Sequence, residues 1–311
     1  MSEPIRIENL TKNFNGLRAV DSLNLLVKKK SFMGFLGPNG AGKTTTIKIL
    51  TNLLTPSGGA AYLNGVDVTK DPKAALTNVG TVVETPEFYP YLTPNETLAY
   101  MGELHGMTRG DIKQRTREVL ETVKMTEWTD KRIGKFSKGM KQRIAIAQAL
   151  LHEPSVVILD EPTSGLDPRG MVEVREILDD LHNEDYTVLM SSHLLAEVQQ
   201  VCTDVALINR GQLLRSGPVD ELTASTNLRR LEIRTVHETP EVLLANISQL
   251  GGVSGLEPLG PRDFGLSLAG GDKAQADLLT QMQNLGLKVI SFKESGVALE
   301  NLYMSLIKET R

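Results

Sequence analysis

The sequence predicts an α/β domain followed by a smaller α+β domain. Up to about residue 225, short apolar runs alternate with helical patterns, which is typical of a mainly parallel sheet covered on both faces. Beyond that point the expected order becomes βαββαβ with a terminal helix, a ferredoxin-like arrangement. We therefore expect two domains, residues 1–225 and residues 226–311.

The first domain is expected to contain a mixed sheet with a helical insertion. Apolar and β-branched runs predict strands at Ile5–Leu10, Ala19–Val27, Phe32–Leu36, Val79–Val83, Val156–Leu159, from Thr187, and at Asp204–Asn209. Helices are predicted at Lys43–Leu54, at Met171–His182 and from about Leu194. The stretch 93–152 has few β-branched clusters, so we expect it to form a helical subdomain inserted between two strands.

The second domain is predicted from the same kinds of pattern. Its strands are expected at Leu228–Val236, Val253–Pro258, Phe264–Leu268 and Leu287–Phe292. Its helices are expected at Pro240–Leu250, Asp272–Leu285 and Ala298–Lys308. The sequence leaves two roles open for this domain, regulation or support of a dimer.

Composition narrows the class of protein. The 311 residues carry a net charge of −4 with a pI near 5.8, which argues against a broad nucleic-acid surface. The single cysteine, Cys202, cannot form an internal disulfide, as expected in a reducing compartment. We find no secretory signal and no apolar run near the roughly 20 residues that a spanning helix needs. Any link to a membrane is therefore expected to go through a partner.

A phosphate-binding loop is the strongest motif. The segment GPNGAGKTT matches G-x-x-x-x-G-K-[ST] and lies between a predicted strand and a predicted helix. Glycines let backbone N–H groups turn toward a phosphate, the lysine can reach its β- and γ-groups, and the following threonine can bind Mg²⁺. A glycine-rich turn with an incidental lysine is the alternative, and the flanking elements disfavour it. The residues expected to bind nucleotide are Gly37, Pro38, Asn39, Gly40, Ala41, Gly42, Lys43, Thr44 and Thr45.

Two further predicted strands end in candidate catalytic residues at the same edge of the sheet. VVILDEP delivers Asp160, expected to bind Mg²⁺, and Glu161, expected to accept a proton from attacking water. MSSH delivers His193, expected to contact the γ-phosphate rather than to serve structure alone. With Lys43, these residues predict phosphoryl transfer to water.

Taken together, these motifs resemble the ATP-binding subunit of an ATP-binding cassette (ABC) transporter over about residues 5–225. FSKGMKQR looks like the signature sequence of that family, SGLD looks like its dimer-contact loop, and Phe14 matches the aromatic residue that stacks on adenine. The resemblance implies a P-loop NTPase fold, ATP and Mg²⁺ as ligands, and ATP hydrolysis. It also implies a homodimer in which Ser137 and Gly139 complete the partner's ATP site.

Two departures from the family pattern change the expected site. Lys138 and Met140 stand where the signature usually has glycine and glutamine, and Lys138 is expected either to face phosphate or to face solvent. Glu84 stands where the family usually offers a glutamine. We expect Glu84 still to touch nucleotide and Mg²⁺, and to slow hydrolysis or make it more dependent on Mg²⁺.

The resemblance also implies a membrane partner. The segment Glu84–Leu98 carries the clustered aromatics Phe88, Tyr89 and Tyr91, which are expected either to contact an integral-membrane permease or to pack locally. Its pattern looks most like bacterial exporters of drugs, antibiotics and sodium and those of gliding motility. The implied location is the cytoplasmic face of the membrane.

Two other functions remain as alternatives at this point. A soluble regulatory ABC-type ATPase acting on ribosomes or DNA usually carries two cassettes or a long coiled-coil insertion, and this chain has one cassette. A nucleotide-binding switch without turnover would not need Glu161 and His193. Both features favour the transport ATPase, with no nucleic acid as partner.

Overall fold

The computed structural model describes residues 3–182, 184, 186–224, 228–294 and 298–309. The chain divides into two compact units, Met1–Pro218 and Val219–Arg311. The division comes before the predicted boundary at residue 225 because the short helix α8 (Val219–Ala224) contacts α11 (Ala298–Glu309) of the second unit. Among the described residues, no helix combines the length and apolar character needed to cross a membrane.

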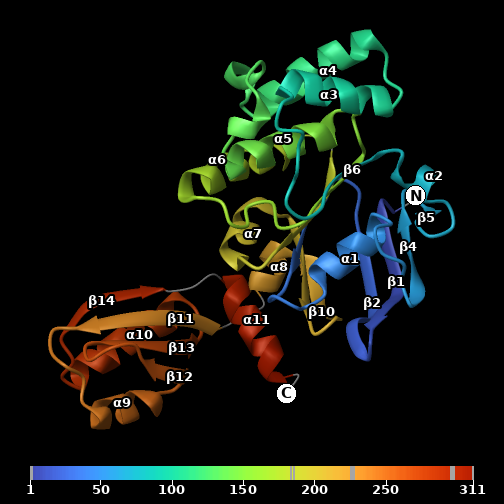
Figure 1. Cartoon of the computed structure of the whole chain (residues 1–311). Coiled ribbons are helices and arrows are strands. Elements are labelled where there is room, and N and C mark those ends of the chain that lie inside the picture. The colour runs from blue at the N-terminus through green and yellow to red at the C-terminus, as the bar shows by residue number, and fades with distance from the viewer. Residues whose placement is uncertain (1–2, 183, 185, 225–227, 295–297, 310–311) are drawn as a thin grey trace. The chain divides into compact units, whose positions relative to one another are not determined.

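A six-stranded mixed sheet forms the centre of the first unit (Figure 1). Its strand order is β10-β9-β3-β8-β7-β6, and every neighbouring pair is parallel except β9 and β10. The strands are β3 (Phe32–Leu36), β6 (Val79–Val82), β7 (Val156–Leu159), β8 (Thr187–Ser192), β9 (Asp204–Asn209) and β10 (Gln212–Pro218). The runs FMGFL and VVIL are buried throughout, as expected for strands covered on both faces.

A second, antiparallel sheet has the order β2-β1-β4-β5. Its strands are β1 (Ile5–Phe14), β2 (Leu17–Val27), β4 (Gly58–Leu63) and β5 (Val66–Asp67). One hydrophobic core joins both sheets to the helix α1 (Lys43–Leu50), which contributes the fully buried Ile47, Ile49 and Leu50. This packing fixes the start of α1 at the end of β3, where the phosphate loop lies.

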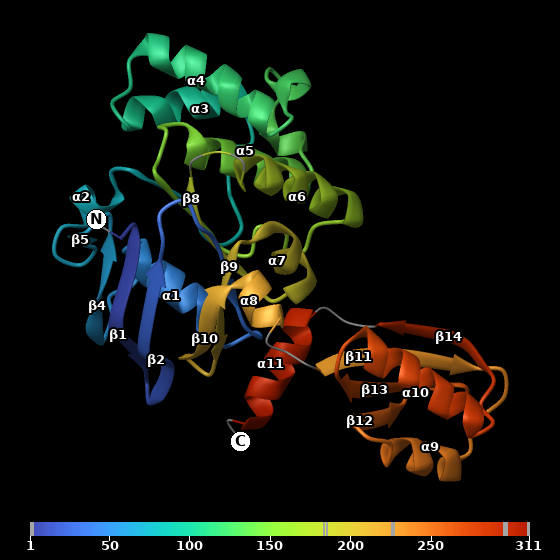
Figure 2. The ribbon, with the colours of Figure 1, turned by 180° about the vertical axis from the view of Figure 1, so that it is seen from behind.

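The predicted helical subdomain comes after β6 and before β7 in the chain and is drawn in green (Figures 1 and 2). It comprises α3 (Pro94–Leu104), α4 (Arg109–Thr122), two short 3₁₀ turns (Thr126–Trp128 and Ile133–Lys135) and α5 (Lys138–Leu150). Side chains cap all three helices: Thr93 and Glu96 form a capping box on α3, Thr108 caps α4 and Ser137 caps α5. The remaining helices of the unit are α2 (Pro72–Leu76), α6 (Pro168–His182) and α7 (Leu195–Val201).

The second unit contains an additional antiparallel sheet with the order β12-β13-β11-β14. Its elements are β11 (Leu228–Thr235), α9 (Glu241–Ser248), β12 (Val253–Pro258), β13 (Asp263–Ala269), α10 (Asp272–Asn284) and β14 (Val289–Glu294), followed by α11. A separate hydrophobic core includes Ile233, Phe264 and Met282. This unit therefore has the packing of a domain in its own right.

Some predicted element ends were wrong. The first strand continues through bulges to Phe14 because it pairs with both β2 and β4. The helix predicted to reach Leu54 ends at Leu50, where the Thr51 hydroxyl bonds back to the Ile47 carbonyl and Asn52 takes a left-handed φ of 55°. The strands β4, β5 and β10 and the helices α2 and α8 were not predicted.

Candidate functional site

The phosphate loop connects β3 to α1, and its backbone requires glycine at two positions. Gly42 has a φ of 104°, and a Cβ there would lie 2.5 Å from the carbonyl oxygen of Ala19. A Cβ on Gly37 would lie 2.5 Å from the carbonyl oxygen of Ile208. Neighbouring strands therefore press closely on the loop and fix its shape around the start of α1.

Lys43 is buried at the first position of α1, with 5% of its surface exposed. Its Nζ donates to the carbonyl oxygens of Gly37 at 2.8 Å and Pro38 at 3.3 Å. The same Nζ lies 3.1 Å from Oε1 of Glu161. A buried ammonium group is thus paired and held at the mouth of the phosphate loop.

Three side chains meet at the carboxyl end of β7. Thr44 donates from Oγ1 to Oδ1 of Asp160 at 3.2 Å, which brings the loop and β7 together. Asp160 is 5% exposed and also accepts a hydrogen bond from Oγ of Ser191 at 2.6 Å. The hydroxyl and the carboxylate are hard oxygen ligands of the kind that Mg²⁺ prefers, so this pair fits the ion.

Glu161 contacts both other predicted catalytic residues. Its Oε2 lies 2.5 Å from Nδ1 of His193, at the end of β8. An ionised carboxylate only accepts hydrogen bonds, so the Nδ1–H of His193 is the donor in this contact. The backbone N–H of Glu161 donates to the Ser191 hydroxyl at 2.9 Å. Lys43, Glu161 and His193 therefore form a continuous chain of charged and polar contacts.

Glu84 lies in the same cleft but has a partner of its own. A cleft of about 770 Å³ is lined by residues that include Thr44, Glu84, Lys138, Asp160 and Glu161. The Glu84 carboxylate forms an ion pair with Lys48 of α1, and its side chain is 61% exposed. A negative charge at this position is therefore offset by a neighbouring lysine.

The signature segment forms the start of α5. Ser137 caps the helix by accepting a hydrogen bond from the Met140 backbone N–H at 3.2 Å. Lys138 is exposed and lines the cleft that holds Asp160 and Glu161, and its Nζ donates to the Ser164 carbonyl oxygen at 3.0 Å. Gly139 is buried, and Ser137 is exposed.

Phe14 lies at the end of β1, with 41% of its surface exposed. The Nζ of Lys12 lies 5.0 Å from its ring centroid. Phe14, Ser137 and Gly139 do not line the cleft that holds Asp160 and Glu161. The structure thus brings together the phosphate loop, Asp160, Glu161, His193 and Glu84, and it leaves these three residues outside that cleft.

Two residues of the site were not predicted. Ser191 joins Asp160 to Glu161, and Lys48 pairs with Glu84. The position of Ser191 carried a usable signal, because it follows a buried strand at the same sheet edge as the two acids. Lys48 carried none, since a lysine on a helix face is most often solvated.

Comparison with known proteins agrees with these motifs. The family model described as "ABC transporter" matches residues 20–164. The chain is 42% identical over 245 residues to the bacitracin transport ATP-binding protein BcrA of Bacillus licheniformis, covering 78% of this chain and 79% of that protein. It is 31% identical over 309 residues to the linearmycin resistance ATP-binding protein LnrL of Bacillus subtilis, covering 98% and 99%.

Solved structures give the same result for the fold. The chain is similar to cbiO1 of Clostridium perfringens, part of the ABC transporter complex cbiONQ, with a TM-score of 0.65 and 26% identity. That match covers 72% of this chain and 92% of the other. These similarities confirm the P-loop α/β fold, to which this chain adds a C-terminal antiparallel sheet. The chain belongs to the ABC transporter family, as an ATP-binding subunit with ATPase activity.

Proposed function

We propose that this subunit couples ATP hydrolysis to export of a substrate through a separate membrane permease. The contact of Glu161 with both Lys43 and His193 is the observation that carries the catalytic part of the proposal. The names of BcrA and LnrL, which refer to bacitracin transport and linearmycin resistance, support export of an antibiotic-like compound. The working location is the cytoplasmic face of the membrane, through the permease.

The named side chains suit phosphoryl transfer from ATP to water. Lys43 and the N–H groups of Gly37–Thr45 bind the phosphates, and the Glu161 carboxylate accepts a proton from the attacking water. His193 would donate from Nε2–H to a γ-phosphate oxygen while Glu161 accepts from its Nδ1–H. Thr44 and Asp160 would hold Mg²⁺, which neutralises developing phosphate charge, with Glu84 beside them.

A head-to-tail homodimer would complete each site. Ser137 and Gly139 at the start of α5 would contact the γ-phosphate bound by the partner, because a helix N-terminus favours an anion. An isologous pair uses both half-sites twice, so two ATP molecules hold the dimer together. Phe14 would stack on adenine, and its exposed ring leaves a face free for that contact.

The segment Glu84–Leu98 is the proposed contact with the permease. Tyr89 and Tyr91 are 57% and 61% exposed, and their ring centroids lie 5.7 Å apart. Exposure of two neighbouring aromatic rings favours a partner contact over local packing. The proposal therefore takes this aromatic pair as the anchor of the permease interface.

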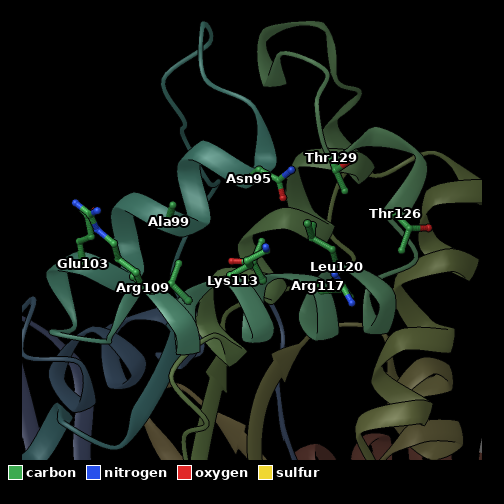
Figure 3. A pocket seen from close by; sticks show the side chains of 11 residues that line it. Asn95, Ala99, Glu103, Arg109, Lys113, Arg117, Leu120, Thr126 and Thr129 are labelled. Carbon is green, nitrogen blue, oxygen red and sulfur yellow. The ribbon is translucent and has the colours of Figure 1, made fainter.

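A groove beside this segment also suits the permease (Figure 3). It has a volume of about 640 Å³ and lies between α3 and α4, with buried Ile112 and Leu120 in its lining. Three basic side chains lie four residues apart along α4 and line the groove: Arg109, Lys113 and Arg117. Within the described part of the chain, none of the three has an ion-pair partner. An acidic segment of the permease would complement their charge.

The second unit is proposed to have a ferredoxin-like fold. Its element order, βαββαβ, and its antiparallel strand order, β12-β13-β11-β14, support that proposal. The match to LnrL extends over this unit as well, which argues for a role shared with that relative. We propose support of the homodimer as that role.

The test is capture of the membrane partner. A tagged Glu161→Gln chain, solubilised with ATP from its native membranes in mild detergent, should retain its partners because the ATP-bound dimer cannot turn over. Mass spectrometry is expected to find a polytopic membrane protein in stoichiometric amount. A matched pull-down with Lys43→Ala, which loses phosphate binding, gives the background. Recovery of ribosomal proteins, or of the homodimer alone, would instead support a soluble regulatory ATPase.

A further inference from the structure

Lys138 makes a contact that the usual glycine of the signature cannot make. It is the first residue of α5, and its side chain reaches the loop that follows β7. There its Nζ donates to the backbone carbonyl oxygen of Ser164 at 3.0 Å. The signature helix is thereby joined to the SGLD loop of the same chain.

A glycine next to Ser164 makes room for this contact. Gly165 has a φ of 66°, and a Cβ there would lie 2.5 Å from Nζ of Lys138. The starts of α5 and α6 also lie side by side, since a Cβ on Gly139 would be in ordinary van der Waals contact with Cα of Gly170 at 3.4 Å. The lysine therefore reaches Ser164 across a closely packed junction.

The Ser164 end of this contact leads directly to the proposed catalytic carboxylate. The backbone N–H of Ser164 donates to the carbonyl oxygen of Glu161 at 3.0 Å, which closes a tight turn. Glu161 itself has a φ of 49° and contacts Lys43 and His193. Movement of Lys138 would thus act on the turn that orients the Glu161 side chain.

We propose that Lys138 is a positioning residue that couples the signature helix to Glu161 of its own chain. This inference rests on the proposed function, in which the start of α5 faces the ATP bound by the partner. Binding of that ATP then acts through Lys138 and Ser164 on the carboxylate of the other site. The two ATP sites of the dimer are linked by this contact in each chain.

Heterodimers distinguish this role from direct contact of Lys138 with the partner's phosphate. Full-length chains with two different tags are combined so that each dimer contains one intact Glu161. The first dimer pairs a Lys138→Met chain with a Glu161→Gln chain, so the intact Glu161 lacks its own lysine. The second pairs an unaltered chain with a Lys138→Met/Glu161→Gln chain, so the intact Glu161 keeps its lysine. The reference pairs an unaltered chain with Glu161→Gln.

The proposal expects the first dimer to have a kcat about 2–10-fold below the reference, as for loss of one hydrogen bond, with KM unchanged. The second dimer should match the reference. The reverse pattern would assign Lys138 to the partner's phosphate and overturn the proposal. Equal rates in all three dimers would overturn it as well.

Two controls guard against a structural effect. Lys135→Met removes a nearby exposed lysine. A dimer that pairs a Lys135→Met chain with a Glu161→Gln chain should have the kcat of the reference. Lys138→Arg keeps a long cationic donor and should restore most of the rate. If Glu161→Gln chains with ATP fail to dimerise in gel filtration, the head-to-tail dimer of the proposed function fails, and this inference fails with it. If they dimerise and the first dimer matches the reference, only the role of Lys138 fails.

Discussion

The Ser191 hydroxyl donates a hydrogen bond to the Asp160 carboxylate at 2.6 Å and accepts one from the Glu161 backbone N–H at 2.9 Å. One side chain thus fixes both acids at the end of β7. Ser191 is fully buried, so water does not readily replace it. This contact gives the first prediction.

Ser191→Ala should lower kcat by about tenfold and raise the Mg²⁺ concentration needed for half-maximal rate. The reason is that a hydrogen bond to a charged group contributes about 1.5–3 kcal/mol, and Asp160 would lose one. ATPase assays over a range of Mg²⁺ concentrations measure both effects. Ser192→Ala is the matched control, because Ser192 is equally buried but accepts from the Leu194 N–H instead. Equal behaviour of the two variants would contradict this role for Ser191.

The ion pair of Lys48 with Glu84 predicts a double-mutant cycle. Lys48→Met should lower the ATPase rate about 2–5-fold at limiting Mg²⁺, since the Glu84 charge is then no longer offset near phosphate; the range is that of exposed ion pairs. Glu84→Gln should raise the rate or lower its Mg²⁺ requirement. The double variant should behave like Glu84→Gln alone. Additive effects, or an unchanged rate and Mg²⁺ dependence in Glu84→Gln, would show that the Glu84 charge does not reach the site.

The basic groove between α3 and α4 predicts a defect in coupling without a defect in catalysis. Lys113→Glu/Arg117→Glu should release the permease in detergent pull-downs while the isolated subunit keeps its ATPase rate, because both residues are exposed on α4. Lys28→Glu/Lys29→Glu reverses two exposed charges in another turn and serves as the control. Retention of the permease by the groove variant would exclude this surface from the interface.

A half-buried histidine predicts how stability depends on pH. His152 stacks on His105 with ring centroids 4.2 Å apart, and burial, followed by the charge of His105, lowers the pKa of His152 from 6.5 to about 4. Between these values the unfolded chain binds a proton that the folded chain does not, so stability falls as the pH drops from about 6.5 to about 4.

His152→Phe keeps a ring for stacking and removes the titration. Its Tm should therefore fall less than that of the unaltered protein between pH 7 and pH 4.5, as measured by scanning fluorimetry. His237→Ala, which changes an exposed histidine, should not alter the pH profile. An unchanged pH profile in His152→Phe would show that other groups cause the acid instability.

Local sequence was enough to predict part of this site. The phosphate loop needs only residues adjacent in the chain, and VVIL followed by two acids predicts a buried strand with Asp160 and Glu161 at its end. The contacts of Ser191 with Asp160, of Lys48 with Glu84 and of Lys138 with Ser164 join residues 31, 36 and 26 positions apart. Periodicity carries no information about such pairs, since tertiary packing creates them.

The strand β4 shows the same limit for the fold. Gly58 and Gly59 form a pair of a kind that usually ends local structure, yet they begin a strand that pairs with β1. A Cβ on Gly59 would lie 2.3 Å from the carbonyl oxygen of Asn9, so the glycine is there to let two strands approach. A residue that breaks local structure can thus be required by a neighbour distant in sequence.

The ion pair of Lys43 with Glu161 has a consequence for measurements of affinity. Any anion that binds the Lys43 ammonium competes with a carboxylate of the same molecule, at a distance of 3.1 Å. The observed affinity for ATP therefore reflects the free energy of exchanging the Glu161 carboxylate for a phosphate at Lys43. Glu161→Gln removes the internal competitor. A trapped complex of this chain therefore gains ATP occupancy in two ways, because Lys43 is released and because the reaction is blocked. Affinities measured with such a variant describe a stronger binder than the natural chain.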